Sequence, residues 1–404
     1  MIVLRRDSRL LRRLAIALTL SALVAPAPGC GGKQPTKSHK RQANATPKVD
    51  QLLAEARQAV GARDDDTADA RFRAAYKAKP DIAILEEHIR FLLAADRVPA
   101  AVELSKAYAA EKPTDARAAH LHATTLISAG DYAAAAEVAG QALARDDNDP
   151  DAHEDKGRAL VLAGKDAEGL EELRRAVQLA PENVEFLIEL GNALHRSGKV
   201  DEAALQLRAA IKLSPEHARA HLVLGRILRD QGELEESQVF LTQASKLDPR
   251  DARPWFELGV LQNKTGDNLG AEASLAKAIE LDATSSLYWY AYAEMLKINK
   301  KIDEALAAYE KAQTAKPPHP KAAAKRGLLL AENKRYGEAE VFLTAAVRED
   351  PQNPYNYLNL AVVLEMQKKY KLAREMYERF LAIAPKEDGD IPKAKAKVRA
   401  LRNR

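Results

Sequence analysis

Cysteine, aromatic residues and long apolar runs are all scarce in this chain of 404 residues. Its single Cys excludes disulfide bonds within the chain and every metal site built from several cysteines. Aromatic residues make up only 5% and alanine is abundant, so helices with small contact residues are favoured over strands. The length exceeds that of one ordinary domain. The 46% hydrophobic and 30% charged content argues against both wholesale disorder and a polytopic membrane protein.

The net charge of +4 conceals an acidic body. Residues 49–387 carry 46 basic and 55 acidic side chains, a net charge of −9. The basic surplus comes from residues 1–29, 31–48 and 388–404. An acidic body repels phosphate backbones, so nucleic-acid binding is disfavoured. The basic segment 31–48 allows contact with anionic headgroups, although a solvated spacer is the simpler interpretation.

The first 29 residues have the pattern of an export signal. Five Arg between residues 5 and 13 precede an apolar run of 12 residues, 14–25, which is short for a bilayer span. Two cleavage sites compete. An ordinary site at Ala25-Pro26-Ala27 would leave Pro28 directly after the cut, where its ring fits poorly in an extended protease site.

The alternative is a lipidation site at Cys30. Residues 27–30 (APGC) resemble a bacterial lipobox, with a small residue directly before the only Cys, although Ala27 and Pro28 depart from the usual pattern. The resemblance implies acyl chains on Cys30, and several chains anchor a protein firmly. Gly31 favours the outer membrane over the inner one. Residues 31–48 lack large apolar side chains and predict a flexible tether.

The body is one unit repeated every 34 residues. Seven prolines lie at multiples of 34 from one another, and a small residue follows ten positions after each of them except Pro385, which Lys395 follows. The other six prolines are also followed by a small residue after 22 positions and, except where Phe380 follows Pro351, by another after 29. The prolines are Pro113, Pro181, Pro215, Pro249, Pro317, Pro351 and Pro385.

Each unit predicts two packed helices. With Pro at position 32, positions 4, 7, 8 and 11 form one helical face, and positions 20, 24, 27 and 28 form another. Small residues at positions 8 and 20 let the two helices approach closely. Position 15 is Gly in five units, from Gly130 to Gly266, and then Lys300, Lys334 and Lys368. This is the position of a helix C-cap, where Gly adopts a positive φ cheaply.

The repeat resembles the tetratricopeptide repeat. Trp255 and Trp289 occupy the Trp slot of that family at position 4, and Tyr309 and Tyr377 its aromatic slot at position 24. The resemblance implies an all-α, right-handed superhelical solenoid whose concave groove is lined by the first helices. We count ten repeats, and residues 388–404 predict a polar capping helix. The repeats are 49–82, 83–115, 116–149, 150–183, 184–217, 218–251, 252–285, 286–319, 320–353 and 354–387.

Residues with the spacing of a catalytic, metal or cofactor site are not evident. His217 and His221 are four apart, but no acidic or Cys ligand joins them. Gly191 and Gly198-Lys199 have the wrong spacing for a phosphate loop, and Val200 replaces the needed Ser or Thr. We therefore predict no enzyme, no cofactor, no metal and no small-molecule substrate.

The groove-facing positions 2, 5, 9 and 12 predict a binding surface in the middle repeats. Position 5 gives an apolar column in four consecutive repeats, and basic or amide side chains surround it. We hypothesise that an extended, apolar and acidic partner segment binds there. Simple packing and local ion pairs are the competing interpretation. The candidate residues are Ile188, Asn192, His195, Arg219, Leu222, Arg226, Arg229, Arg253, Phe256 and Tyr290.

Three functional hypotheses remain open. The first is a non-enzymatic scaffold, lipid-anchored at the periplasmic face of the outer membrane, that helps to assemble a pilus, secretion or polysaccharide-export complex. Bacterial repeat lipoproteins of this kind are what the chain resembles. The second is a soluble periplasmic or secreted binding module, if Cys30 carries no lipid. The third is the regulatory arm of an enzyme system whose catalytic subunit is another chain.

Overall fold

The computed structural model describes residues 46–402, and in that range the protein consists of 21 helices without a strand. This confirms the all-α prediction. The helices fall into two compact units, which divide between Pro215 and Glu216. The predicted signal peptide and Cys30 lie outside the described residues. Of the predicted flexible tether, only residues 46–48 are described, and they form the beginning of the first described helix.

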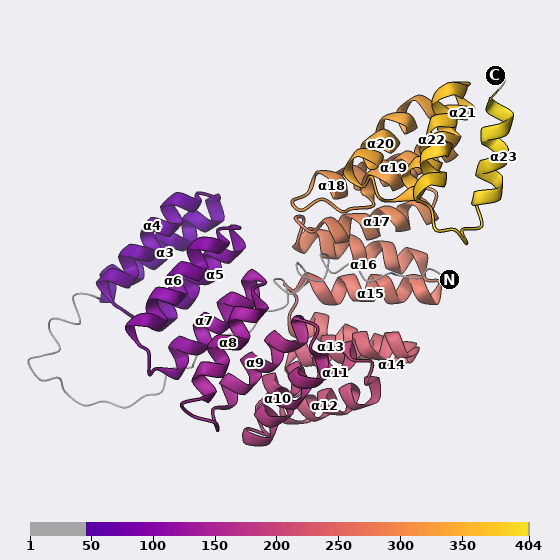
Figure 1. Ribbon diagram of the computed structural model, residues 1–404. Coiled ribbons are helices and arrows are strands. Elements are labelled where there is room, and N and C mark those ends of the chain that lie inside the picture. Colours follow the sequence, from indigo (N-terminus) through magenta and orange to yellow (C-terminus); the bar gives the residue numbers. More distant parts are fainter. Residues whose placement is uncertain (1–45, 403–404) are drawn as a thin grey trace, which may run out of the picture. The chain divides into compact units, whose positions relative to one another are not determined.

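The first unit holds ten helices within the described range, and consecutive helices pack against each other (Figure 1). They are α3 (Thr46–Ala62), α4 (Asp65–Ala78), α5 (Ile82–Ala94), α6 (Val98–Glu111), α7 (Ala116–Ala129), α8 (Tyr132–Leu143), α9 (Pro150–Leu162), α10 (Asp166–Leu179), α11 (Val184–Arg196) and α12 (Val200–Leu213).

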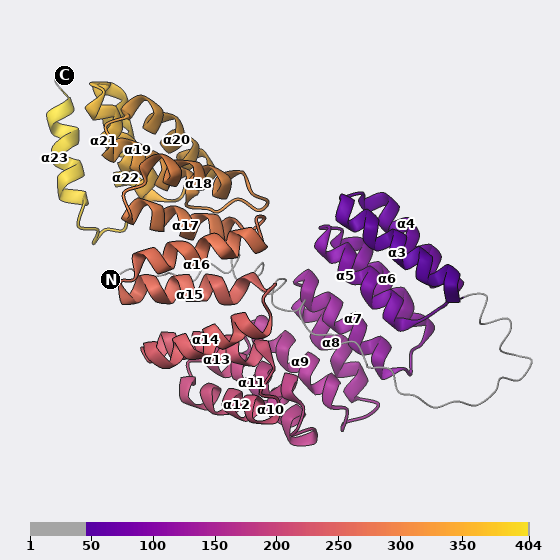
Figure 2. The same ribbon diagram turned by 180° about the vertical axis from the view of Figure 1, so that it is seen from behind.

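The second unit continues the same alternation, and Figure 2 shows its last helix, α23, beside α22. Its helices are α13 (Ala218–Gln231), α14 (Leu234–Leu247), α15 (Ala252–Thr265), α16 (Asn268–Leu281), α17 (Ser286–Ile298), α18 (Ile302–Thr314), α19 (Ala322–Glu332), α20 (Tyr336–Glu349), α21 (Pro354–Met366), α22 (Tyr370–Ile383) and α23 (Ile391–Leu401). Ala394, Val398 and Leu401 bury one side of α23.

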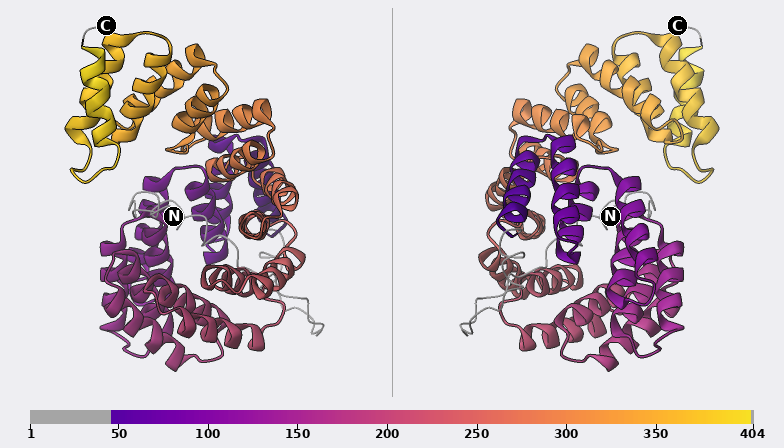
Figure 3. Two further views of the ribbon diagram at one scale, coloured as in Figure 1. Left: turned by 90° about the vertical axis from the view of Figure 1, so that its right-hand side faces the viewer. Right: turned by 90° about the vertical axis from the view of Figure 1, so that its left-hand side faces the viewer.

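Figure 3 shows the stacked helix pairs from two further sides. Within each unit the odd-numbered helices from α5 onward lie on one side of the stack, because most neighbouring members of this set contact each other. Neighbouring odd-numbered helices contact each other, as α7 does with α9 and α13 with α15. The even-numbered helices make no comparably close contact among the described residues. We call the surface of the odd-numbered helices the first-helix face. On this side of each stack neighbouring helices contact one another, and all the residues of the predicted groove lie on its helices.

A left-handed residue separates the two helices of each pair. The five glycines at position 15 have φ between 77° and 92°, which confirms the predicted C-caps. Lys300, Lys334 and Lys368 take the same conformation at φ near 60°. Arg63 and Asp96 do so in the first two pairs. Helix α5 begins at Ile82, one residue before the expected repeat, because the turn between Pro80 and the N-cap Asp81 lacks one residue.

The small residues at positions 8 and 20 set the distance within each pair. A Cβ added to Gly157 would lie 2.7 Å from Cγ of Leu173 and 2.9 Å from the carbonyl oxygen of Gly169. One added to Gly259 would lie 2.6 Å from Cγ of Leu275. These separations confirm that the helices pack too closely for a larger side chain there. No helix of the described residues is both long and apolar enough to cross a bilayer.

Candidate functional site

The predicted groove residues lie on first helices of both units, and each unit is described by itself. Three lie on α11 of the first unit, where Asn192 and His195 are partly buried. In the second unit, four lie on α13, two on α15 and one on α17: Arg219, Leu222, Arg226 and Arg229, then Arg253 and Phe256, then Tyr290.

The apolar column is not an exposed surface along its whole length. Ile188 is 0% exposed and Leu222 is 5% exposed. Leu222 packs in a cluster with Leu241, Leu258 and Leu261 of its own unit. Position 5 lies beside the packing face of the helix, and in these two repeats the neighbouring side chains cover it. Binding of a partner at the column stays a prediction.

Two aromatic members of the column are only partly buried. Phe256 stacks on Tyr288 of the next repeat, with ring centres 4.9 Å apart. Tyr290 stacks on His319, with ring centres 3.8 Å apart and an interplanar angle of 15°. Burial lowers the pKa of His319 to about 4, so the stacked ring is neutral at pH 7. These contacts hold both rings in place within the second unit.

The arginines of the second unit are embedded in the first-helix face. Arg229 forms ion pairs with Glu257 and with Asp230. Burial lowers the pKa of the Arg229 guanidinium, but these two carboxylates outweigh that effect and leave it raised. Arg253 reaches back to its N-cap residue, Asp251, with a nitrogen–oxygen distance of 2.7 Å. Local ion pairs, the competing interpretation, therefore account for part of the charge at Arg229 and Arg253.

Basic side chains nevertheless outnumber acidic ones on these two helices. Helices α13 and α15 carry five basic residues and two acidic ones. Arg226 is largely buried, and burial lowers the pKa of its guanidinium. Helices α9 and α11 of the first unit have the opposite balance, with five acidic and three basic residues.

The first unit contains a charged cluster that the sequence analysis did not single out. Nδ1 of His120 on α7 lies 2.8 Å from Oδ2 of Asp155 on α9. Glu154 is beside it, and a guanidinium nitrogen of Arg158 lies 3.2 Å from a Glu154 carboxylate oxygen. Glu154 and Asp155 are 4% and 1% exposed. Position 5 places His120 and Glu154 on adjacent helices, and this was the signal available in the sequence.

The electrostatics of this cluster are set by burial and by its acidic excess. The negative charge of Asp155 raises the pKa of His120 well above its ordinary value. Burial raises the pKa of Glu154, although Arg158 acts against this effect. Arg158 also lies 3.7 Å from Glu189 on α11, so it connects two first helices.

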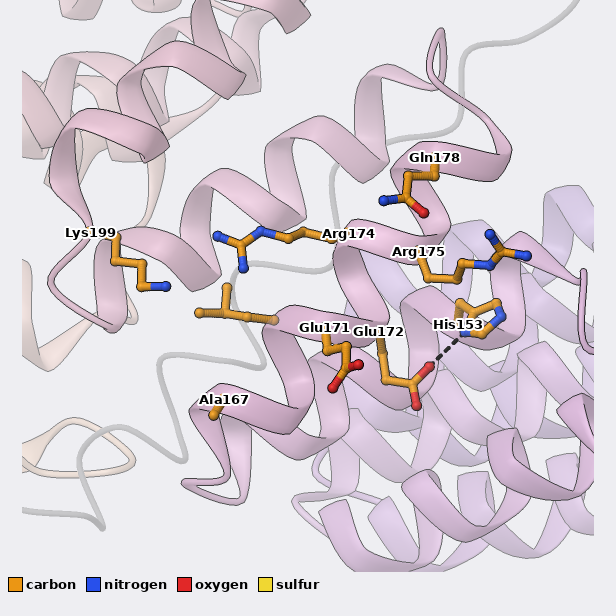
Figure 4. A pocket seen from close by; sticks show the side chains of 9 residues that line it. His153, Ala167, Glu171, Glu172, Arg174, Arg175, Gln178 and Lys199 are labelled. Atoms are coloured by element: carbon orange, nitrogen blue, oxygen red, sulfur yellow. Dashed lines mark hydrogen bonds and ion pairs between the residues drawn. The ribbon is translucent and has the colours of Figure 1, made fainter.

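A separate hollow of about 620 Å³ lies along α10 on the opposite layer of the first unit (Figure 4). Three of its lining side chains, His153, Glu172 and Arg174, form ion pairs. Nδ1 of His153 is 2.6 Å from Glu172, Nζ of Lys156 is also 2.6 Å from Glu172, and Arg174 is 2.7 Å from Glu202. These ion pairs reduce the charge that this part of the hollow offers to a ligand.

Comparison with known families decides what these stacked helix pairs are. A tetratricopeptide repeat model matches residues 120–184, 188–241, 264–320 and 296–354, and a second such model matches residues 330–398. Together the matches span more than half of the chain. The chain belongs to the tetratricopeptide repeat family. Tetratricopeptide repeat proteins generally mediate protein–protein interactions, and the fold is generally non-catalytic.

Several solved tetratricopeptide repeat structures are similar to this chain. Yeast Tom70 is 14% identical over 89% of this chain and 96% of its own, with a TM-score of 0.49. PilF of Pseudomonas aeruginosa is 19% identical over 56% of this chain and 99% of its own, with a TM-score of 0.46. A thermophilic repeat protein of Thermus thermophilus, TTC0263, is 25% identical over 45% of this chain and 100% of its own, with a TM-score of 0.40. No curated protein matches this chain.

Proposed function

We propose that this tetratricopeptide repeat protein is a non-enzymatic scaffold that binds an extended acidic segment of a partner protein. The observation that carries the proposal is the excess of basic residues on α13 and α15, two helices of the first-helix face. They carry five basic residues and two acidic ones. Fixed aromatic rings, Phe256 among them, lie in the same face. Guanidinium groups suit carboxylates, and ordered rings supply apolar contact at little entropic cost.

The proposal also covers where the protein works. Cys30 would carry the lipid, residues 31–45 would connect it to the first helix, and the repeats would lie at the periplasmic face of the outer membrane. There the scaffold would assist in assembling an envelope complex for a pilus, secretion or polysaccharide export. The export-signal pattern before Cys30 and the repeat fold after it support this assignment together.

The anchor is tested by acyl labelling and fractionation of the native chain beside Cys30→Ser. The expected result is labelled protein in the membrane fraction for the native chain, and unlabelled, soluble protein for the variant. Equal labelling of both chains would contradict lipidation at Cys30. Soluble native protein without label would favour the periplasmic or secreted binding module instead.

Partner binding is tested by gentle crosslinking and capture of the tagged chain from its native host. We expect Arg219→Gln combined with Arg226→Gln to reduce recovery of the captured partner about tenfold or more, since interface charges at a binding centre often contribute over 1 kcal/mol each. Neutral substitutions are chosen because Leu222→Asp would place a charge in the packed cluster around Leu241.

A matched control removes the same charge from the other layer. Lys212→Gln combined with Lys246→Gln alters exposed residues of α12 and α14. Capture should then stay at the native level, and circular dichroism should show unchanged helicity in both double variants. Equal loss in the two double variants would mean that charge in general, and not the first-helix face, holds the partner.

A further inference from the structure

We infer that His120, Glu154 and Asp155 bind one divalent transition-metal ion, with Zn²⁺ as the best chemical fit. One imidazole nitrogen and one oxygen from each carboxylate lie within 4.8 Å of one another. Two first helices supply them, α7 and α9, so the site rests on packed secondary structure rather than on a loop. The inference is independent of the partner-binding proposal.

The separations suit a shared ion. Metal bonds of about 2.0–2.2 Å to nitrogen and oxygen place tetrahedral ligand atoms about 3.4 Å apart. Metal binding at Nδ1 of His120 would release to solvent the proton that Nδ1 donates to Oδ2 of Asp155, and this 2.8 Å contact would open slightly to reach that separation. The remaining ligand atoms lie within 4.8 Å of one another, so they would have to move closer around the ion by side-chain rotation.

A second observation concerns the carboxylate of Asp155 itself. Oδ1 of Asp155 is buried and has no hydrogen-bond partner, although the side chain is only 1% exposed. A buried carboxylate oxygen without a partner costs free energy, because it has lost its water and gained nothing in return. A cation held by both oxygens of the Asp155 carboxylate would remove that cost.

The charge balance around Asp155 also favours a cation. Asp151, Glu154, Asp155 and Glu189 bring four carboxyl groups to α9 and the adjacent part of α11, and Arg158 is the cation that pairs with two of them. Arg158 lies 3.2 Å from Oε1 of Glu154, and a metal would bind the same carboxylate through Oε2. A divalent ion would offset the remaining negative charge.

Two other histidine–carboxylate pairs of the same unit differ from His120–Asp155 in one respect: their carboxylate also pairs with a lysine or arginine. Asp69, which faces His88 at 2.6 Å, also pairs with Arg73 at 3.0 Å. Glu172, which faces His153 at 2.6 Å, also pairs with Lys156 at 2.6 Å. Within residues 46–402, Asp155 forms its ion pair with His120 alone, and no Lys or Arg is paired with it. In the other two pairs a lysine or arginine also contacts the carboxylate. At Asp155 we infer that a metal ion takes the place of that cation.

The donor set selects the kind of ion. One imidazole with two carboxylates suits Zn²⁺, Co²⁺ or Mn²⁺ better than the soft ions that thiolates bind. Three protein ligands leave a coordination position open, and the His120 side chain is 41% exposed. Water, or a carboxylate or imidazole of a partner, would complete the shell from that side. A bound ion would also cross-link α7 to α9, because its ligands come from both helices.

The test titrates the full chain with Zn²⁺ by calorimetry and with Co²⁺ by visible absorption. The expected result is one ion per chain, with Co²⁺ bands of a nitrogen and oxygen environment and no thiolate charge-transfer band, which excludes the single Cys as a ligand. His120→Gln and Glu154→Gln should each weaken binding by on the order of 10–100-fold or more, the loss known for supporting residues of metal sites.

His153→Gln is the matched control, because it removes a histidine–carboxylate pair that a lysine already completes. It should bind the ion as the native chain does. Circular dichroism and thermal melts with and without Zn²⁺ accompany each variant, and Asp155→Asn provides a ligand change of the same size. A native chain without stoichiometric binding overturns the inference even if a variant unfolds. So does a His120→Gln variant that folds and binds like the native chain.

Discussion

The first-helix faces of the two units are built by the same repeat but carry side chains of opposite charge balance. In the first unit, α9 and α11 carry an acidic excess around His120, Glu154 and Asp155. In the second unit, α13 and α15 carry arginines beside stacked aromatic rings. Packing residues at positions 8 and 20 are small in both units. The comparison teaches that packing specifies the fold, whereas the positions between packing residues are free to specify a ligand.

The largest expected effect breaks the acidic cluster. Arg158→Met leaves Glu154 and Glu189 without their shared cation, so we expect the first unit to lose roughly 3–5 kcal/mol of unfolding free energy. Hydrogen exchange at α9 and α11 and urea unfolding measure the loss. Arg174→Met, whose pair with Glu202 is exposed, should cost less than about 1 kcal/mol. Equal losses of unfolding free energy in the two variants would show that the ion pairs of Arg158 contribute no more than an exposed ion pair does.

A second prediction concerns acid stability in the second unit. The pKa of His319 is lowered to about 4, so its stabilisation is complete above the unfolded pKa near 6.5 and is lost as the pH falls toward 4. The loss is roughly 3 kcal/mol at the acid end. His319→Phe keeps the stack on Tyr290 without the titration, and should flatten the dependence of the melting temperature on pH between 6.5 and 4. An unchanged pH profile would contradict the assignment.

A third prediction concerns the close approach of the paired helices at position 8, which the two units share. Gly157→Ala and Gly259→Ala should each cost about 1–3 kcal/mol, because the new Cβ overlaps a leucine of the paired helix. Gly157→Ala should cost more, since the added atom also lies 2.9 Å from a backbone oxygen, against 3.2 Å at Gly259. Chemical unfolding followed by hydrogen exchange compares them. A neutral Gly157→Ala would mean that the helices adjust freely.

The smallest expected effect lies at position 15. Lys300 holds a left-handed conformation that costs an L-residue about 1 kcal/mol relative to Gly, so Lys300→Gly should stabilise the second unit by up to that amount. Gly198→Ala in the first unit should destabilise it by a similar amount. Paired thermal melts test the two signs, and two changes of the same sign would contradict the account of these turns.

Much of the fold could be predicted from the sequence, because a period of 34 residues fixes which side chains pack. The C-cap glycines and the small residues at position 8 fall where the period puts them. Burial of Ile188 and Leu222 could not be predicted, since position 5 borders the packing face and its exposure depends on the size of neighbouring side chains. The His120 cluster depends on side-chain distances between two repeats, which no single repeat shows.

The central claim is that a partner contacts the first-helix face of the second unit. A photoreactive phenylalanine analogue in place of Asn263, exposed near the end of α15, tests it in the native host, with the same analogue at Gln238 of α14 as the matched site. The account predicts a partner adduct from position 263 and none from position 238. An adduct from position 238 alone, or equal adducts from both, would contradict it.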